Sequence, residues 1–469
     1  MIDAAYSAWF WGFLLVYGGI MYVLSPVARS EQGFFHGTDG AGRPATEWAL
    51  FCSVFISWIF AKSVTNAANL GAKYGVVGGL AYAAYWLSIP LAGWVIYRLR
   101  TRHAAQGLVA FLIAKYGRTA ALAFTVAILI RLYNEIWSNT AVVGAYYGPS
   151  GSAAFIGAAL LFTAVTLLYS VRGGLRSSIV TDIVQAGFFA VALAALLLVV
   201  LPKHGLPQLL STGAWDLGAG VDLLLVALLQ VFSYPFHDPV LTDRGFITRE
   251  KTMLRAFILA GALGFVCILA FSLLGVHAKL EGLKASGDNI PGLVAQSFGI
   301  LPYLITTAIM IVAAGSTVDS TFASLAKSFG QEIPLLAGRR PGARAVSVGA
   351  WTMVVFALLG NLPMIAGADI LKATTISGTM VMGLAPAFLL HRHAGGSPWS
   401  FHLGFWPGIV LGGLLAAGHM PRSWAIGEGD YALLLGVNVY GLLLCTALFL
   451  LPALVSRLAP RLQSSPRAG

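Results

Sequence analysis

The sequence predicts an all-α membrane protein that crosses the bilayer many times. Its 469 residues are 58% hydrophobic and only 10% charged, whereas soluble domains carry about 25% charged residues. Runs of roughly 20 apolar residues recur along the whole chain, and a helix needs about that length to cross the hydrocarbon of a bilayer. Too little polar surface remains for a water-exposed domain, so we expect a single membrane domain.

Thirteen apolar runs are candidates for membrane-spanning helices. The first has no basic segment before it and no small-residue cleavage site ahead of Pro26, so we interpret it as a retained helix and not as a signal peptide. The thirteen runs cover approximately residues 9–25, 47–70, 75–97, 119–147, 152–170, 178–201, 220–240, 254–275, 302–328, 345–361, 369–390, 403–418 and 431–455.

The distribution of Lys and Arg predicts the orientation. If the N-terminus lies outside, 21 of the 29 basic residues fall on cytoplasmic segments. The outer segments then hold five, which are Lys73, Lys203, Lys279, Lys284 and Arg422. Because cytoplasmic loops are enriched in Lys and Arg, this asymmetry predicts an N-out, C-in protein of the inner (plasma) membrane. It also explains the net charge of +11 by topology and anionic lipid, without nucleic acid.

The three cysteines, Cys52, Cys267 and Cys445, all lie inside apolar runs. None forms a CxxC pair, so we expect small core residues with neither a disulfide nor a metal.

Polar residues inside the spans are the main functional signal, because charge is costly in hydrocarbon. In the second span Lys62, Ser63 and Thr65 stand among further polar residues. Such a segment suits a helix that breaks and turns its carbonyls toward a cavity. The alternative is a helix end whose polar side chains cap it and snorkel.

The fourth and sixth spans carry charges of their own. Arg131 and Glu135 are four residues apart on one helical face, where they can pair. Such a pair either contacts a ligand or joins helices. Asp182, near the cytoplasmic end of the sixth span, is a candidate site residue or an interface residue.

The seventh and ninth spans carry two further polar groups. His237 and Asp238 lie between Pro235 and Pro239, and two prolines so close cannot sit in a regular helix. The ninth span holds oxygen-bearing side chains without sulfur or imidazole, which suit Na⁺ or a proton unless the hydroxyls bond back to their own helix. These residues are Ser316, Thr317, Asp319 and Ser320.

One motif resembles a known family. Gly173 and Gly174 precede a Thr181-Asp182 pair, and Gln185 follows three residues on. This pattern is similar to the signature of the sodium:solute symporter family, which includes proline, galactose and sialic acid symporters. The resemblance extends over nearly the whole chain, through residues 31–35 with Trp48, the basic segment 97–102, the turn at 114–117, residues 239–244, the Ser316-Thr317 pair and residues 408–413.

The resemblance implies a fold of thirteen helices with a leucine-transporter-like core of two inverted five-helix repeats. Residues 1–46 would hold an extra helix and a loop, 47–201 the first repeat, 202–395 the second repeat, and 396–469 two final helices with a short tail. The first helix of each repeat would be broken, near Lys62 and within 235–239.

The resemblance also implies ion sites. The sodium ligands would be the carbonyls of Ala61, Val64 and Ala313 and the hydroxyls of Ser316 and Thr317. A second cation or proton site would use Asp182, Asp319 and Ser320. The solute cavity would be lined by the polar residues Lys62, Ser63, Thr65, Arg131, Tyr133, Glu135, Trp137, His237 and Asp238, which favours a small polar or carboxylate-bearing solute.

Two departures from the family pattern leave alternatives open. Lys62 stands where relatives often carry an uncharged or acidic residue, and its ammonium could replace the sodium ion. Asp319 stands where relatives usually have serine.

The sequence therefore predicts a Na⁺-coupled symporter with a small polar solute, in contact with the bilayer and without nucleic acid or organic cofactor. The alternatives are a proton-coupled or Na⁺-independent transporter, or a transporter-like sensor that acts through a partner. An enzyme is not expected, because no HExxH or GxSxG motif is present.

Overall fold

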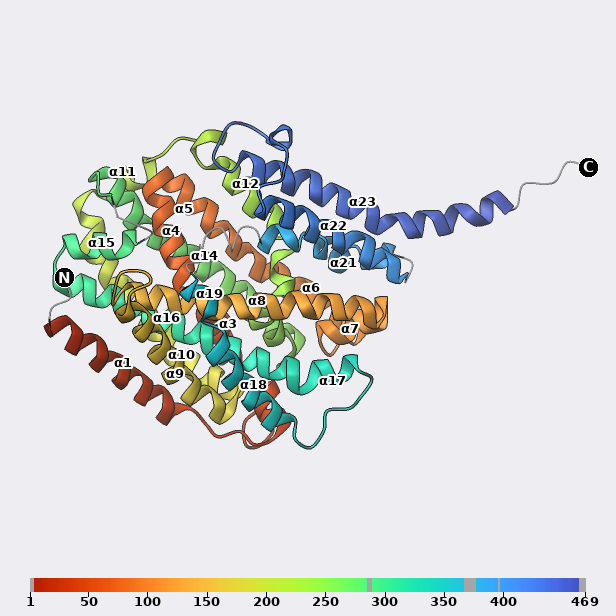
Figure 1. Cartoon of the computed structure of the whole chain (residues 1–469), viewed down its shortest axis with the longest axis horizontal. Helices are drawn as coiled ribbons and strands as arrows, with labels where there is room; N and C mark the ends of the chain where they lie inside the picture. Colours follow the sequence, from red (N-terminus) through yellow and green to blue (C-terminus); the bar gives the residue numbers. More distant parts are fainter. Residues whose placement is uncertain (1–3, 285–288, 367–376, 395–396, 464–469) are drawn as a thin grey trace, which may run out of the picture.

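Long helices make up most of the chain in the computed structural model, which describes residues 4–284, 289–366, 377–394 and 397–463 (Figure 1). These ranges contain no β-strand. The first helices are α1 (Ala4–Leu24), α2 (Glu31–His36), α3 (Glu47–Ser57), α4 (Ala61–Tyr74), α5 (Val76–Ala83), α6 (Ser88–His103), α7 (Leu108–Tyr116), α8 (Arg118–Ala145), α9 (Ala153–Gly173), α10 (Leu175–Val200) and α11 (Leu206–Ser211). The remaining helices are α12 (Val221–Gln230), α13 (Pro239–Thr242), α14 (Glu250–Leu280), α15 (Ile290–Ser297), α16 (Ile300–Lys327), α17 (Ile333–Leu336), α18 (Ala345–Leu359), α19 (Leu362–Ile365), α21 (Leu384–Leu389), α22 (Pro398–Ala416) and α23 (Ala432–Gln463).

Ten helical segments of the described chain are long and apolar enough to cross a membrane, and the bent pair α3 and α4 adds one more. The prediction of a polytopic all-α membrane protein is therefore confirmed. Two predicted spans are not among these segments. The run 220–240 is split, with α12 covering only its first ten residues. The run 369–390 is described only from residue 377 onward, so the number thirteen stays a prediction.

Two helices are interrupted, as the polar residues inside the spans predict. α3 and α4 meet at a 56° bend, and residues 58–60 between them are not helical. The helix α12 ends at Gln230, a short 3-10 helix covers Tyr234–His237, and α13 starts at Pro239. The first break comes before Lys62, so that Lys62 lies in the first turn of α4 instead of in the break itself.

The helix α4 is held against α14 by small residues. A methyl group added to Gly275 of α14 would lie 1.7 Å from the carbonyl oxygen of Ala68, so only glycine permits this approach. Close backbone packing at small residues is the usual way in which helices associate in lipid, where apolar burial supplies no driving force. The contact fixes the polar helix α4 in the interior, where nearly all its residues are buried.

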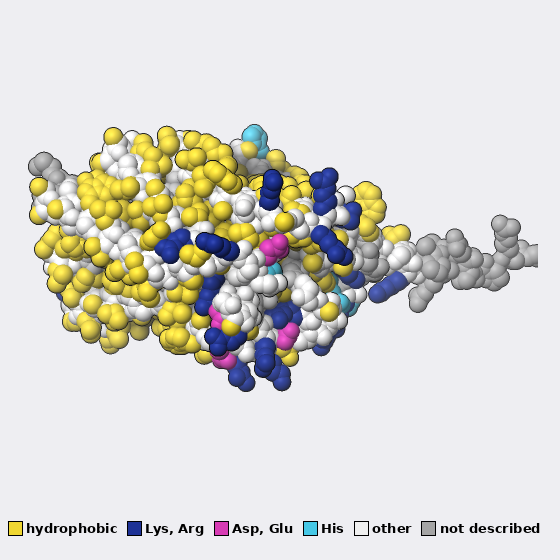
Figure 2. Space-filling view, turned by 90° about the horizontal axis from the view of Figure 1, so that it is seen from below, with side chains coloured by type: hydrophobic (Ala, Val, Ile, Leu, Met, Phe, Trp, Pro, Cys, Tyr) yellow, Lys and Arg dark blue, Asp and Glu magenta, His cyan; other side chains and the backbone are white. Residues whose placement is uncertain are grey.

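Charged and hydrophobic side chains separate on the surface. Figure 2 shows Lys and Arg side chains gathered on the half of one face toward the C-terminal tail, whereas hydrophobic side chains cover the other half. The predicted N-out orientation places this basic half on the cytoplasmic side. The three cysteines are buried and free of disulfides.

Candidate ion and solute site

Four charged side chains from three parts of the fold form a buried network, which we call the lysine network. Lys62 Nζ donates to Glu135 Oε1 at 2.6 Å and to Ser138 Oγ at 3.0 Å. Arg131 pairs with the same Glu135, and its Nη2 donates to Asp238 Oδ2 at 3.0 Å. All four charged side chains are 0% exposed. Two cations face two anions, so the network is neutral when all four groups are ionised.

The breaks and a helical turn bring these residues together. Arg131 and Glu135 face the same way because they are one turn apart on α8. Asp238 caps α13, and its Oδ1 accepts from the backbone N–H of Val240 at 3.1 Å. The guanidinium of Arg131 lies over the rings of Phe60 and Tyr234, at 5.6 and 5.1 Å from their centroids. Aromatic faces thus replace part of the hydration that the cation lacks.

The other residues predicted to line the solute cavity divide into two groups. Ser63 lies 3.2 Å from the Tyr82 hydroxyl, and Thr65 donates back to the Ala61 carbonyl at 3.0 Å. His237 Nδ1 lies 2.5 Å from the Tyr234 carbonyl, and its Nε2 is buried without a hydrogen-bond partner among the described residues. These three residues lie on the same broken segments as the lysine network.

Trp137 and Tyr133 do not join this network. Trp137 packs in a separate apolar cluster with Phe155 and Met364, because it projects from another face of α8 than Glu135. The hydroxyl of Tyr133 donates to the Leu359 carbonyl near the surface. Both residues therefore lie outside the lysine network, and their place in the solute cavity stays a prediction.

A second buried network, which we call the aspartate network, joins α10 and α16. Asp319 accepts from the hydroxyls of Ser178 at 2.8 Å and Thr181 at 3.1 Å. Asp182 accepts from the hydroxyls of Ser53 and Ser316, each at 2.5 Å. These residues come from the three helices α3, α10 and α16, and every one of them is at most 2% exposed.

Arg244 enters the aspartate network from the segment that follows α13. Its Nη2 donates to Ser320 Oγ at 2.7 Å, to Asp182 Oδ2 at 3.1 Å and to Ser178 Oγ at 3.1 Å. Arg244 is one of the 21 basic residues assigned to cytoplasmic segments, but it is 0% exposed and so is not a solvated loop charge. A guanidinium therefore lies among the three residues predicted to bind a second cation.

Oxygen atoms from α3 and α16 meet where the first break begins. Thr317 Oγ1 donates to the carbonyl of Ala313 at 3.1 Å and to that of Ser57, the last residue of α3, at 3.4 Å. Ser57 Oγ is buried and has no hydrogen-bond partner within the described chain. An all-oxygen set with an unsatisfied hydroxyl fits a hard cation such as Na⁺.

The two carbonyl ligands that were predicted near the first break both belong to α4. Ala61 and Val64 lie inside α4, past the break, and the Ala61 carbonyl accepts the Thr65 hydroxyl. The hydroxyl of Thr317 instead approaches Ser57, four residues earlier. The break lies at residues 58–60, directly before Lys62, near which it was predicted.

The fold is similar to that of known transporters. A Na⁺-coupled sialic acid symporter, solved in a substrate-bound outward-open state, superposes with a TM-score of 0.74 at 16% identity and covers 97% of this chain and 98% of its own. Mhp1, a nucleobase-cation-symport-1 family transporter, superposes in a closed conformation with a TM-score of 0.56 at 12% identity, covering 91% of this chain and 95% of its own.

One curated protein also matches in sequence. Sodium/glucose cotransporter 4 of Danio rerio is 26% identical over 184 residues, which are 38% of this chain and 27% of that protein. No family model matches the chain. The resemblance to sodium:solute symporters is confirmed. The chain spans about a quarter of this curated relative, and the solved structures show the fold alone. The proteins named here are transporters and not enzymes.

Sequence reasoning missed the partners of the charged residues. Arg244, Ser53 and Ser178 carry the aspartate network, and Tyr82 joins Ser63. Ser178 lies four residues before Asp182, on the same face of α10, so helical spacing could have identified it. The other three lie on segments distant in sequence, and only the fold brings them near.

Proposed function

We propose that the chain is a secondary active symporter that couples the inward movement of Na⁺ to the uptake of a small polar solute by alternating access. The observation that carries the proposal is the group of oxygen atoms at the first break, where α3 ends against α16. Broken helices at mid-membrane supply carbonyl ligands for coupling ions in transporters of this architecture. In the same proposal the chain has thirteen helices, the four-part division given above and an N-out orientation.

The sodium site would be held by the carbonyls of Ser57 and Ala313 and by the hydroxyls of Ser316 and Thr317. Bound Na⁺ would supply one positive charge there. These ligands come from the end of α3 and from α16, so they hold α3 against α16 when they share an ion. Loss of the ion would release that contact, and this provides a physical reason for coupling between the ion and the movement of α3.

Charge in the aspartate network favours a cation nearby. Asp182 and Asp319 carry two negative charges when ionised, and Arg244 supplies one positive charge. A buried net charge is unfavourable. Ser316 belongs to the proposed sodium ligands and also donates to Asp182, so it connects the ion site with this excess charge.

A proton on Asp319 is the second candidate for the positive charge that balances the aspartate network. Asp319 has hydroxyl donors but no ion pair among the described residues, whereas Asp182 pairs with Arg244. Protonation of Asp319 would neutralise the network without Na⁺. In both versions Arg244 acts as a fixed cation at the site where a second ion was predicted, so we propose a single coupling ion.

The solute would bind beside the lysine network. Because Lys62 already pairs with Glu135, the network needs no anionic solute for neutrality. His237 Nε2, Ser63 and the aromatic residues Phe60 and Tyr234 then provide polar and stacking contacts for a small polar molecule. This view replaces the idea that Lys62 occupies the sodium site.

A ligand-stability screen of the purified protein tests the proposal. Thermal unfolding is measured with polyols, sugars, sugar acids, amino acids and urea-like compounds, each in NaCl and in choline chloride. We expect at least one solute to raise the unfolding temperature in NaCl and much less in choline chloride. A solute that stabilises the protein equally in both salts, by the same amount at every pH, would refute ion coupling. Equal effects in both salts at each pH, combined with a strong pH dependence, would favour the proton version.

A further inference from the structure

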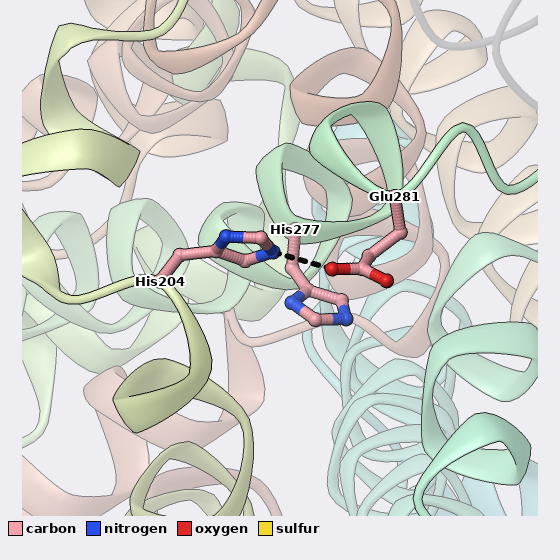
Figure 3. A group of neighbouring side chains, drawn as sticks. All are labelled: His204, His277 and Glu281. Carbon is pink, nitrogen blue, oxygen red and sulfur yellow. Dashed lines mark ion pairs between the residues drawn. The ribbon is translucent and has the colours of Figure 1, made fainter.

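Two histidines and a glutamate meet at the end of the molecule where α10 and α14 finish. His204 follows the short 3-10 helix Leu201–Lys203 after α10, and His277 and Glu281 stand at the end of α14 (Figure 3). One ligand atom from each of the three lies within 4.8 Å of the other two. His204 Nε2 is 2.8 Å from Glu281 Oε1, and the rings of His204 and His277 have centroids 5.1 Å apart.

Both ring nitrogens of His277 lack a hydrogen-bond partner among the described residues and could bind a ligand. His277 is 1% exposed, and neither nitrogen has a hydrogen-bond partner in the described chain. A buried imidazole with two unsatisfied nitrogens is unfavourable, since buried polar groups are nearly always paired. Its ring packs on Phe298, with centroids 5.2 Å apart, so its position is set by packing and not by a polar contact. A ligand that accepts electron pairs from nitrogen would satisfy it.

The charge of the cluster suits a divalent cation. The ammonium of Lys203 donates to Glu281 Oε2 at 2.8 Å. The other oxygen of that carboxyl, Oε1, faces His204. Lys203 opposes a bound cation by its charge, but its side chain is 48% exposed and can turn into solvent. Two imidazoles and one carboxylate then remain as ligands.

We infer that His204, His277 and Glu281 form a binding site for a transition-metal ion of the Zn²⁺ type. Two nitrogens and one oxygen match a three-ligand zinc site that keeps its fourth position for water, and hard cations such as Ca²⁺ or Mg²⁺ prefer oxygen alone. Bonds of about 2.1 Å place tetrahedral ligands about 3.4 Å apart, so modest side-chain rotations from the present separations suffice. The site is distinct from both buried networks.

Metal binding would join the ends of two long helices. His204 belongs to the connection after α10, and the other two ligands belong to α14, which packs against the broken helix α4 through Gly275. In the proposed orientation this end faces outside, because Lys203 and Lys279 are outer residues. The ion would therefore tie α10 to α14 from the outer side and stabilise one arrangement of these helices.

Direct binding of Zn²⁺ to the full chain tests this inference. Isothermal titration with ZnCl₂ is carried out in detergent, after any polyhistidine tag has been removed. We expect saturable binding with one ion per chain, and a dissociation constant at least tenfold higher in His277→Gln and in Glu281→Gln. His419→Gln is the matched control, because His419 is exposed at another outer position and should leave the affinity unchanged.

Spectroscopy keeps the inference testable if a variant fails to fold. Co²⁺ added to the wild type should give the intense visible absorption of four-coordinate cobalt, and Zn²⁺ should remove it. MgCl₂ at the same concentration should not. Absence of saturable Zn²⁺ binding, a six-coordinate cobalt spectrum, or an unchanged affinity in both His277→Gln and Glu281→Gln would each overturn the assignment.

Discussion

Replacement of Lys62 by methionine tests whether this residue is a structural partner of Glu135 or a direct contact of the solute. The substitution keeps the length of the side chain and removes its charge. Both side chains of the pair are 0% exposed, and their charged atoms are 2.6 Å apart. Removal of one partner of a buried pair costs about 3–5 kcal/mol. Arg131 still faces Glu135 in the variant, so we expect a loss near the lower limit, about 3 kcal/mol.

The expected loss translates into a measurable shift of the unfolding temperature. An unfolding entropy of about 2.1 cal/mol/K per residue gives on the order of 1 kcal/mol per degree for 469 residues. Lys62→Met should therefore unfold roughly 3 °C below the wild type in the absence of solute. Differential scanning fluorimetry in detergent measures this shift, with the aggregation state checked by size-exclusion chromatography.

A second substitution identifies the partner. Lys62→Met combined with Glu135→Gln removes one charge of each sign and leaves the Arg131–Asp238 pair, so most of the lost stability should return. The matched control is Lys62→Met with Asp238→Asn, which has the same net charge but removes an anion that Lys62 does not contact directly. Equal recovery in both double variants would refute the pairing. A single variant with wild-type stability and weakened solute binding would instead assign Lys62 to the solute.

The remaining predictions concern packing and the aspartate network. Gly275→Ala should destabilise the protein by about 3 kcal/mol or more through overpacking, because its methyl group would meet the Ala68 carbonyl. The control is Gly157→Ala, because no atom lies within 4 Å of a methyl group added there. Asp319→Asn should change the Na⁺ or pH dependence of solute binding more than the maximal binding, and an unaltered profile would assign Asp319 to a structural role. Arg244→Gln should lower the unfolding temperature because Asp182 loses its cation, and adding Asp182→Asn should recover part of the loss.

The sequence alone could predict the class of fold and the segments that matter. Long apolar runs define α1, α8, α10, α14 and α16 to within a few residues, because length and hydropathy decide which helices can span a bilayer. The breaks were also predictable, since prolines and clustered polar residues cannot remain in a regular lipid-facing helix. The first break, predicted near Lys62, lies at residues 58–60, directly before it. Helix ends are the least predictable part of a helix from sequence.

The partners within the site were less predictable. Arg131 and Glu135 share one helix, so their pairing follows from spacing. Its place between two apolar runs predicted Arg244 to be a loop charge. In the fold, the segment after α13 is buried, and Arg244 there donates to Asp182. Trp137 was assigned to the cavity by proximity in sequence to Glu135, but two residues on a helix are turned about 200° apart, which explains its packing on Phe155.

Titration of Na⁺ into the purified protein tests the central claim most directly. Binding is followed by intrinsic tryptophan fluorescence or by the unfolding temperature, with choline chloride holding the ionic strength constant. We expect a saturable response to Na⁺ in the wild type and its loss in the Ser316→Ala, Thr317→Ala double variant. The control is Ser324→Ala on the same helix, which should keep the response. This control removes a buried hydroxyl that has no hydrogen-bond partner among the described residues. A wild-type protein that responds identically to Na⁺ and choline, or a double variant that binds Na⁺ as tightly as the wild type, would contradict the proposed sodium site.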